Sequence, residues 1–442
     1  MPQTAVAAVP TTAVAVPATS YAVERSTLAN GLRVVVTPDR SSPVVAVAVY
    51  YDVGIRSEPE GRTGFAHLFE HLMFQGSASL QKMEHVKYVQ ASGGTLNGST
   101  RMDYTNYYEA LPSHALERAL FLEADRMHSP RVTEENLANQ IAVVKEEIRV
   151  NVLNQPYGGF PWLTLPPVLF DTFPNAHNGY GGFEDLESAT VADAQDFFDR
   201  YYAPGNAVLA IGGDLDVAEA MALVERHFGD VPSRAVPPRP DFDEAPPATE
   251  RRAEQVDPQA PAPAVALGWR VPDPADLDAY LPFVVLTSAL TTGDASRLRR
   301  RLVHEDRLAT DVGSHLGLME DPFDVRNPTA LILEAHHGAD VTGDRVVTAV
   351  DEELDRLATD GLDTGELERV QARLGSALVQ GQDHVLGRVL SMAVFEQQRG
   401  RAELVGELPA LLGEVDGGQV QAAAAALRPQ SRARLDVVAG GR

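Results

Sequence analysis

Residues 64–76 read Gly-Phe-Ala-His-Leu-Phe-Glu-His-Leu-Met-Phe-Gln-Gly, and they place His67 and His71 four positions apart with Glu70 between them. The neighbouring residues are apolar around nearly the whole circumference of a helix, which predicts that the helix is buried. Residues four apart lie one above the other on one helix face, so both imidazoles can bind the same metal ion. Glu70 points toward the same site. Burying these three groups without a partner is costly, and a metal site is therefore favoured over a group of core histidines.

A zinc site needs a further protein ligand, because zinc takes about four ligands and a catalytic site leaves one position for water. Residues 133–150 read as a helix with an apolar stripe at spacings of four, three and four: Leu137, Ile141, Val144 and Ile148. At about 100° per residue, Glu146 lies opposite the stripe and Glu147 lies on its flank. Glu147 is therefore the candidate third ligand. Gln140, on the same flank, is a candidate for supporting the ligands. Without the histidines, Glu147 would read as an ordinary acid at a helix edge.

The run from Gly93 to Thr100 is small, polar and extended, and a second strand candidate follows at 104–111. A strand of small side chains lets another backbone come close. This suits an edge strand that captures an extended peptide by strand addition, with Asn97, Gly98 and Ser99 as candidate substrate-binding residues. An ordinary hairpin with a glycine bulge explains the run equally well.

The chain of 442 residues is too long for one core, so we expect two domains. The expected units are a disordered tail (1–20), a domain that carries the candidate zinc site (21–232), a Pro-rich linker (233–262) and a homologous domain without that site (263–442). The homology rests on residues 200–213 and 427–440, which both show a Pro turn, a strand and a glycine end. The second half has no His-x-x-Glu-His. Its adjacent histidines, His336 and His337, do not share a helix face and are expected at the surface.

The charge balance argues against two classes of partner. The chain has 37 basic and 62 acidic residues, a net charge of −25, so neither nucleic acid nor an anionic membrane surface is expected to bind it. The absence of cysteine suits a cytoplasmic protein. Residues 1–20 lack the basic start and unbroken apolar core of a secretory signal. No stretch approaches the ~20 apolar residues of a membrane span.

The residues 67–71, His-Leu-Phe-Glu-His, form the inverted zincin motif. With this motif the chain resembles the M16 metallopeptidases, the family of mitochondrial processing peptidase, pitrilysin and insulysin, and in particular the short two-domain bacterial type. The third ligand of that family lies in a Val-x-x-x-Glu context. Residues 143–147 supply this context, and Glu147 stands 76 positions after His71. The strand with Asn97 resembles the family's substrate strand, while Gln140 stands where many members carry a glutamate.

The resemblance implies an α+β fold of two homologous α/β-sandwich domains of the LuxS/M16 peptidase type, which form half of a clamshell chamber. It also implies a zinc metalloendopeptidase in which His67, His71 and Glu147 hold Zn²⁺. Glu70 would be the general base toward a zinc-activated water that attacks the peptide bond. Two alternatives remain open: a non-catalytic scaffold subunit, and a peptide-binding subunit that holds zinc structurally.

The resemblance further implies a partner subunit. In relatives, the second half of the chamber supplies an arginine and a tyrosine near the zinc, and the corresponding positions here are Val303 and Thr310. We therefore expect a heterodimer with an M16 paralogue that lacks the zinc motif and supplies both residues. Nearby Arg301 or Arg307 could substitute instead. Quality control of proteins, presequence removal and leader-peptide removal all fit as the task of such a peptidase.

Overall fold

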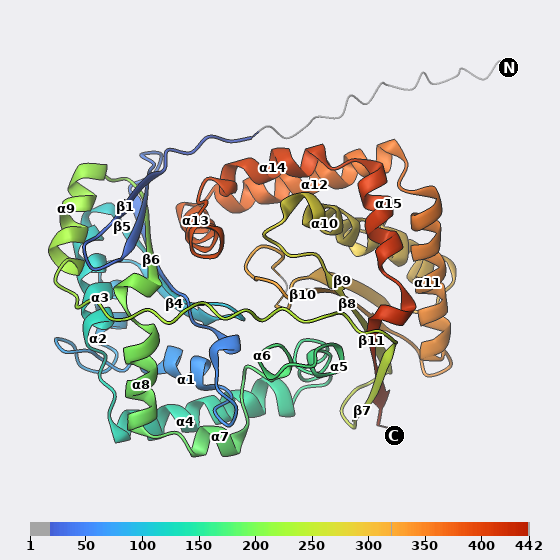
Figure 1. The fold of residues 1–442 in the computed structure, drawn as a ribbon, viewed down its shortest axis with the longest axis horizontal. Helices are drawn as coiled ribbons and strands as arrows, with labels where there is room; N and C mark the ends of the chain where they lie inside the picture. Colours follow the sequence, from blue (N-terminus) through green and yellow to red (C-terminus); the bar gives the residue numbers. More distant parts are fainter. Residues whose placement is uncertain (1–17, 320, 441–442) are drawn as a thin grey trace.

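The computed structural model describes residues 18–319 and 321–440 as two β-sheets with helices on their faces (Figure 1). The first sheet has six strands in the order β1-β2-β6-β3-β5-β4. Only the β2–β6 pair is parallel. Strand β4 is an edge of this sheet. The strands are β1 (Glu24–Thr27), β2 (Arg33–Pro38), β3 (Val44–Tyr51), β4 (Thr95–Thr100), β5 (Thr105–Pro112) and β6 (Ala207–Gly213).

The second sheet repeats this topology, as the predicted duplication requires. Its five strands run in the order β7-β11-β8-β10-β9, and again the pair formed with the last strand, β7–β11, is the parallel one. Strand β11 is thus the counterpart of β6, which matches the two sequence segments predicted to be equivalent. The strands are β7 (Arg251–Asp257), β8 (Ala264–Val271), β9 (Asp311–Leu316), β10 (Thr329–His336) and β11 (Arg432–Ala439).

Strand β7 lies inside the stretch 233–262, which the sequence predicts to be a linker throughout. Seven polar-rich residues form a strand here because an edge strand needs only backbone pairing on one side, which β11 supplies. The predicted domain boundaries otherwise stay a prediction. Residues 1–17 of the predicted tail lie outside the described residues, whereas the Thr19 amide donates a hydrogen bond to the Gly406 carbonyl.

The helices that the sequence predicts at 113–128 and 133–150 are observed as α3 and α4. Helix α4 begins where the Thr133 hydroxyl accepts a hydrogen bond from the Asn136 amide at 3.1 Å. The first half contains α1 (Phe65–Leu72), α2 (Glu84–Ala91), α3 (Leu116–His128), α4 (Glu134–Ile148), α5 (Pro166–Leu169), α6 (Phe173–Ala176), α7 (Phe183–Glu187), α8 (Val191–Tyr201) and α9 (Val217–Phe228). The second half contains α10 (Leu277–Thr291), α11 (Gly343–Asp360), α12 (Thr364–Gln382), α13 (Val385–Arg399), α14 (Leu404–Glu414) and α15 (Gly417–Ala426).

Each half of the chain packs a helix against the sheet of the other half. Helix α13 of the second half packs on β3 and β6 of the first sheet, and α5 of the first half packs on β8 and β11 of the second (Figure 1). Glycines allow both contacts: a Cβ at Gly212 would lie 2.5 Å from Val389, and one at Gly268 would lie 3.0 Å from Leu165. These contacts join the two sheets through shared apolar cores, so the residues that line a site between the halves are held in fixed positions.

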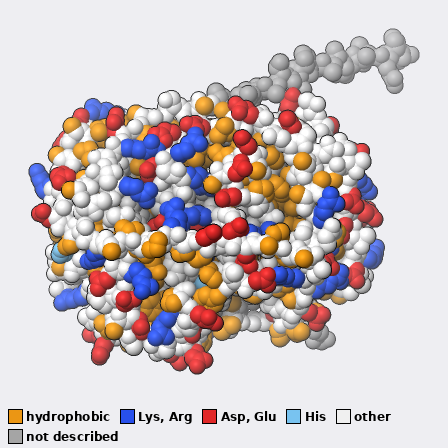
Figure 2. Space-filling view, viewed as in Figure 1, with side chains coloured by type: hydrophobic (Ala, Val, Ile, Leu, Met, Phe, Trp, Pro, Cys, Tyr) orange, Lys and Arg blue, Asp and Glu red, His pale blue; other side chains and the backbone are white. Residues whose placement is uncertain are grey.

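On the face shown in Figure 2, acidic and basic side chains are interspersed rather than gathered by sign. No helix among residues 18–319 and 321–440 has the length and apolar character needed to cross a membrane. The expected cytoplasmic location stays a prediction.

Candidate metal centre and substrate cleft

Helices α1 and α4 bring three metal-ligating side chains together, as the sequence predicts. The Nε2 atoms of His67 and His71 lie 3.3 Å apart, and Glu147 Oε2 lies 3.4 Å from His71 Nε2 and 3.8 Å from His67 Nε2. Zinc bonds of about 2.0–2.1 Å in a tetrahedral arrangement place donor atoms about 3.4 Å apart. The donor set and its spacing therefore fit zinc with three protein ligands.

The geometry of α4 separates the two adjacent glutamates. The Glu146 side chain is 65% exposed and pairs with Arg149 at 3.0 Å, whereas the Glu147 side chain is 31% exposed and faces α1. Along the predicted stripe, Leu137, Val144 and Ile148 are buried and Ile141 is partly buried. The stripe thus turns α4 so that Glu147 reaches the histidines.

The electrostatics of the three side chains suit metal binding. Burial and the neighbouring His71 lower the pKa of His67 to about 4. Burial lowers the pKa of His71 as well, but the hydrogen bond with Glu147 and nearby carboxylate charge outweigh it, so that pKa is raised. The hydrogen bond with His71 lowers the pKa of Glu147. His67 is therefore neutral and Glu147 ionised at neutral pH, which are the forms that bind metal.

Glu70 lies between α1 and the edge strand β4. Burial raises the pKa of Glu70, although a hydrogen bond from the Thr100 hydroxyl to Oε2, at 2.7 Å, acts in the opposite direction. The other carboxylate oxygen, Oε1, lies so close to β4 that a Cβ at Gly98 would be 3.1 Å away. The absence of a side chain at Gly98 therefore makes room for the carboxylate.

The beginning of α1 is held by a buried carboxylate. Glu58 accepts hydrogen bonds from the amides of Gly64 at 2.9 Å and Ala66 at 2.7 Å, and His177 Nε2 lies 3.0 Å from Glu58 Oε2. The amides at a helix N-terminus lack partners within the helix, so the carboxylate satisfies them and complements the helix dipole. This contact sets where α1 begins and hence where His67 and Glu70 lie.

The candidate substrate residues lie on β4, which among the described residues pairs only with β5 and so leaves one edge unpaired. The exposed Asn97 accepts a hydrogen bond from the Gly98 amide at 3.0 Å through its side chain. The Ser99 hydroxyl donates to Asn106 at 2.6 Å. The roles of Asn97, Gly98 and Ser99 in substrate binding stay a prediction. Gln140 is buried, and its side-chain amide donates a hydrogen bond to Asn139 at 2.8 Å, so its role in supporting the ligands stays a prediction.

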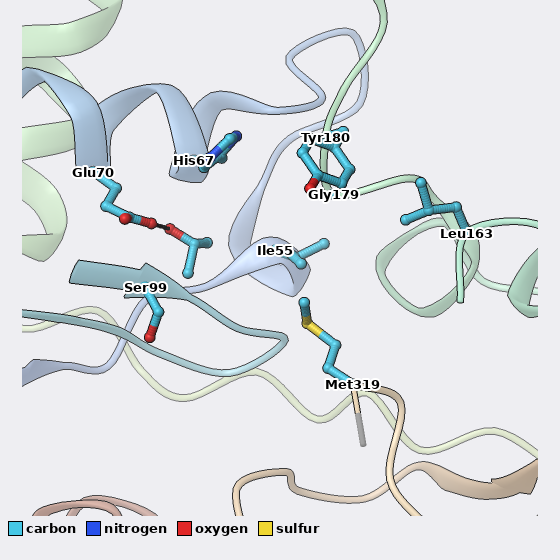
Figure 3. Close-up of a pocket in the computed structure, with 9 residues that line it drawn as sticks. Ile55, His67, Glu70, Ser99, Leu163, Gly179, Tyr180 and Met319 are labelled. Carbon is cyan, nitrogen blue, oxygen red and sulfur yellow. Dashed lines mark hydrogen bonds between the residues drawn. The ribbon is translucent and has the colours of Figure 1, made fainter. Parts of the chain in front are cut away.

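A cavity of about 230 Å³ opens beside the metal centre (Figure 3). Its polar side carries His67, Glu70, Ser99 and Thr100, and its apolar side carries Ile55, Leu163, Tyr180 and Met319. A second cavity of about 300 Å³ shares Leu163, Tyr180 and Met319 with the first. Met319 belongs to the second half of the chain, so both halves form the cleft.

Several residues near the centre were given no role in the site by the sequence. Glu58, Thr100 and Tyr180 come from loops and a strand, and their approach to α1 depends on tertiary packing. His177 has no ligand-like pattern, yet it contacts Glu58. The surface location expected for His336 and His337 is wrong: His337 is buried, and the half-buried His336 packs its ring on Tyr157 with centroids 4.6 Å apart.

A second group of His85, Glu109 and Glu123 is buried between α2, β5 and α3. Arg126 forms an ion pair with Glu123, so the positive charge that balances this carboxylate comes from a guanidinium and not from a metal ion. Burial raises the pKa of Glu109 and lowers that of His85, so burial favours the neutral form of both groups. This group is therefore explained as a structural core network.

The second half places Val303 and Thr310 away from the cavity lining. Val303 is half-buried against the core, and the Thr310 hydroxyl donates to the His336 carbonyl at 3.1 Å. Arg301 donates to the Ala349 carbonyl at 2.8 Å and pairs with Asp306 at 3.3 Å. The Arg301 guanidinium is therefore bound to groups of the second half rather than placed at the cavity.

Comparisons with known proteins agree with this geometry. Residues 33–157 match the family model described as insulinase (peptidase family M16), and residues 188–374 match the one described as peptidase M16 inactive domain. The chain is 32% identical over 307 residues to the zinc protease PqqE of Helicobacter pylori, covering 67% of each chain. It is 30% identical over 372 residues to an uncharacterized zinc protease of Mycobacterium leprae, covering 82% of this chain and 80% of the relative.

The fold has close counterparts among solved structures. A protease from Helicobacter pylori superposes with a TM-score of 0.86 at 24% identity, covering 94% of this chain and 99% of that one. The match extends over both halves, so the two-sheet arrangement is the fold of an M16 half-chamber.

Proposed function

This chain belongs to the M16 peptidase family, and from that premise we propose that it is a zinc metalloendopeptidase that cleaves peptides or unfolded segments. The observation that carries the proposal is the trio His67, His71 and Glu147, whose ligating atoms are spaced as a tetrahedral zinc requires. Glu70 lies on α1 between the two histidines and is not one of the three candidate ligands. A structural zinc site would be closed by a fourth protein ligand instead.

Zinc bound by these residues would lower the pKa of a water ligand toward ~7 and polarise the scissile carbonyl. Glu70 is the group positioned to take a proton and to pass it to the leaving amine. The Thr100 hydroxyl holds Oε2 of Glu70, which leaves Oε1 for the proton transfer. The raised pKa of Glu70, caused by burial, brings its basicity closer to that task.

The unpaired edge of β4 supports an extended peptide as the substrate. A peptide added to β4 would form backbone hydrogen bonds alongside Asn97, Gly98 and Ser99 and would pass directly under Glu70. Strand addition recognises the backbone of the substrate, so the bound segment must be free of secondary structure of its own. Intact folded proteins are therefore not expected to be cleaved.

We further propose a heterodimer in which an M16 paralogue without the zinc motif completes the chamber and supplies an arginine and a tyrosine. The support is that Val303 and Thr310 occupy the corresponding positions of this chain and that Arg301 is engaged with Asp306 and Ala349. The test is to assay the purified chain with internally quenched peptides, alone and then with the paralogue. Full activity of the chain alone, as a homodimer, would refute the heterodimer.

The variant Glu70→Gln tests the peptidase itself. It should retain zinc while the rate of hydrolysis by the complex falls by about 10²–10⁴-fold, because a general base contributes that much. Glu146→Gln, on the exposed face of α4, is the control and should hydrolyse at the wild-type rate. Wild-type activity in Glu70→Gln would remove this residue from the mechanism.

A further inference from the structure

The loop 177–182, between α6 and α7, packs tightly against the start of α1. A Cβ at Gly64 would lie 2.5 Å from the Tyr180 carbonyl oxygen, and one at Gly181 would lie 2.3 Å from the Thr63 carbonyl oxygen. Asn178 accepts a hydrogen bond from the Tyr180 amide through its side chain at 2.9 Å. The loop therefore holds Tyr180 in a fixed place relative to the metal-binding helix.

The Tyr180 ring stands edge-on to His67, with the ring centroids 5.5 Å apart and the planes at 90°. Figure 3 shows Tyr180 beside His67, on the opposite side of the cavity from Ser99 of β4. Asn151, in the π-helix η3 (Arg149–Leu153) that follows α4, lies near the Tyr180 hydroxyl. A tyrosine hydroxyl can both accept a hydrogen bond and donate its own proton.

The other hydroxyls that line the cavity are engaged. Thr100 donates to Glu70, and Ser99 donates to Asn106. A peptide on β4 would turn alternate carbonyls toward β4 and away from it. His67, Glu70 and Tyr180 line the same cavity beside β4, so a carbonyl that approaches the candidate metal centre through this cavity also approaches the Tyr180 ring.

We propose that Tyr180 is a catalytic residue that donates a hydrogen bond to the scissile carbonyl oxygen as that oxygen gains negative charge. This role rests on the proposed peptidase function and places the donor in the chain that carries the zinc ligands. Donors aimed at developing charge in a water-poor site act mainly on the transition state. Removing the hydroxyl should therefore lower kcat more than it changes KM.

The test is Tyr180→Phe, which keeps the ring against His67 and removes only the hydroxyl. In the complex with the partner subunit, kcat for an internally quenched peptide should fall roughly 10²-fold with KM little changed. Zinc content should stay at the wild-type level. The affinity for a dipeptidyl phosphonamidate, which mimics the charged oxygen, should fall by a similar factor. Tyr88→Phe, an exposed tyrosine on α2, is the matched control and should match the wild type in every measurement.

Three results would overturn the role of Tyr180: an unchanged kcat, an effect confined to KM, or loss of zinc from Tyr180→Phe. Unchanged phosphonamidate affinity would overturn it as well. These outcomes differ from failure of the proposed function, in which the wild-type complex itself would bind no zinc or cleave no peptide.

Discussion

Replacing Glu58 with glutamine tests how the metal-binding helix is held in place. The Glu58 carboxylate is 3% exposed and accepts from the amides of Gly64 and Ala66 at 2.9 and 2.7 Å, with His177 at 3.0 Å from one of its oxygens. Glutamine has nearly the same shape but only one acceptor oxygen. Its NH₂ group would face either the Ala66 N–H or both the Gly64 N–H and the imidazole, so in each case a buried backbone donor loses its partner.

The expected cost follows from that lost contact. A hydrogen bond to a charged acceptor contributes about 1.5–3 kcal/mol, so Glu58→Gln should reduce the free energy of unfolding by about that amount. Displacing the start of α1 also moves His67. Changes in groups that orient metal ligands typically weaken metal binding about 10–100-fold, and we expect zinc affinity to fall within this range.

Two measurements check this prediction: urea unfolding of the metal-free protein, and zinc competition against a chromophoric chelator. Glu60→Gln, two residues along and exposed, is the control and should behave as the wild type. If Glu58→Gln matched the wild type in both unfolding and zinc affinity, the assignment of Glu58 as the anchor of α1 would be refuted.

Two further predictions concern other contacts. Gly98→Ala places a Cβ 3.1 Å from Glu70 Oε1 and should displace the carboxylate, so the hydrolysis rate should fall about 10-fold or more while zinc is retained. Gly413→Ala, at a glycine with open space around it, is the control. An unchanged hydrolysis rate in Gly98→Ala would show that Glu70 does not depend on this gap. Hydrogen bonds from Ser41 and the charge of Arg388 lower the pKa of Asp39 to about 2. Because the folded-state pKa is depressed, Asp39 stabilises the fold above its ordinary value of 3.8 and this contribution is lost as the pH falls toward 2. Asp39→Asn should therefore cost up to about 1 kcal/mol at pH 7, since the group is partly solvated, and clearly less at pH 2, where Asp39 in the folded protein is about half protonated. A cost that does not change with pH, in urea unfolding at both pH values, would contradict this.

The approach of the three candidate metal ligands could be predicted from the sequence because helix periodicity is a local property. The spacing of His67 and His71 places both on one face of α1, and the stripe of α4 places Glu147 rather than Glu146 at the buried edge. The wheel position decides between the two glutamates, whereas the expectation that this helix supplies a ligand rests on the resemblance to a family. The fold class followed from the same motif through its resemblance to a family.

The remaining parts of the centre depend on contacts between distant segments. Glu58 contacts His177 across 119 positions, and the contact depends on how two loops pack, which leaves no periodic signal. Tyr180 reaches the cavity through a loop whose path is set by glycine contacts with α1. Strand β7 was predicted as linker for a related reason, because its stability comes from pairing with β11 near the end of the chain.

The central claim is that His67, His71 and Glu147 hold a catalytic zinc, and metal analysis of three purified proteins tests it most directly. The wild type and Glu146→Gln should each contain about one zinc per chain, and Glu147→Gln should contain much less, because Glu147 Oε2 lies within 3.4 Å of His71 Nε2 while Glu146 faces solvent. A wild type without zinc, or a Glu147→Gln variant that keeps zinc while Glu146→Gln loses it, would contradict the claim.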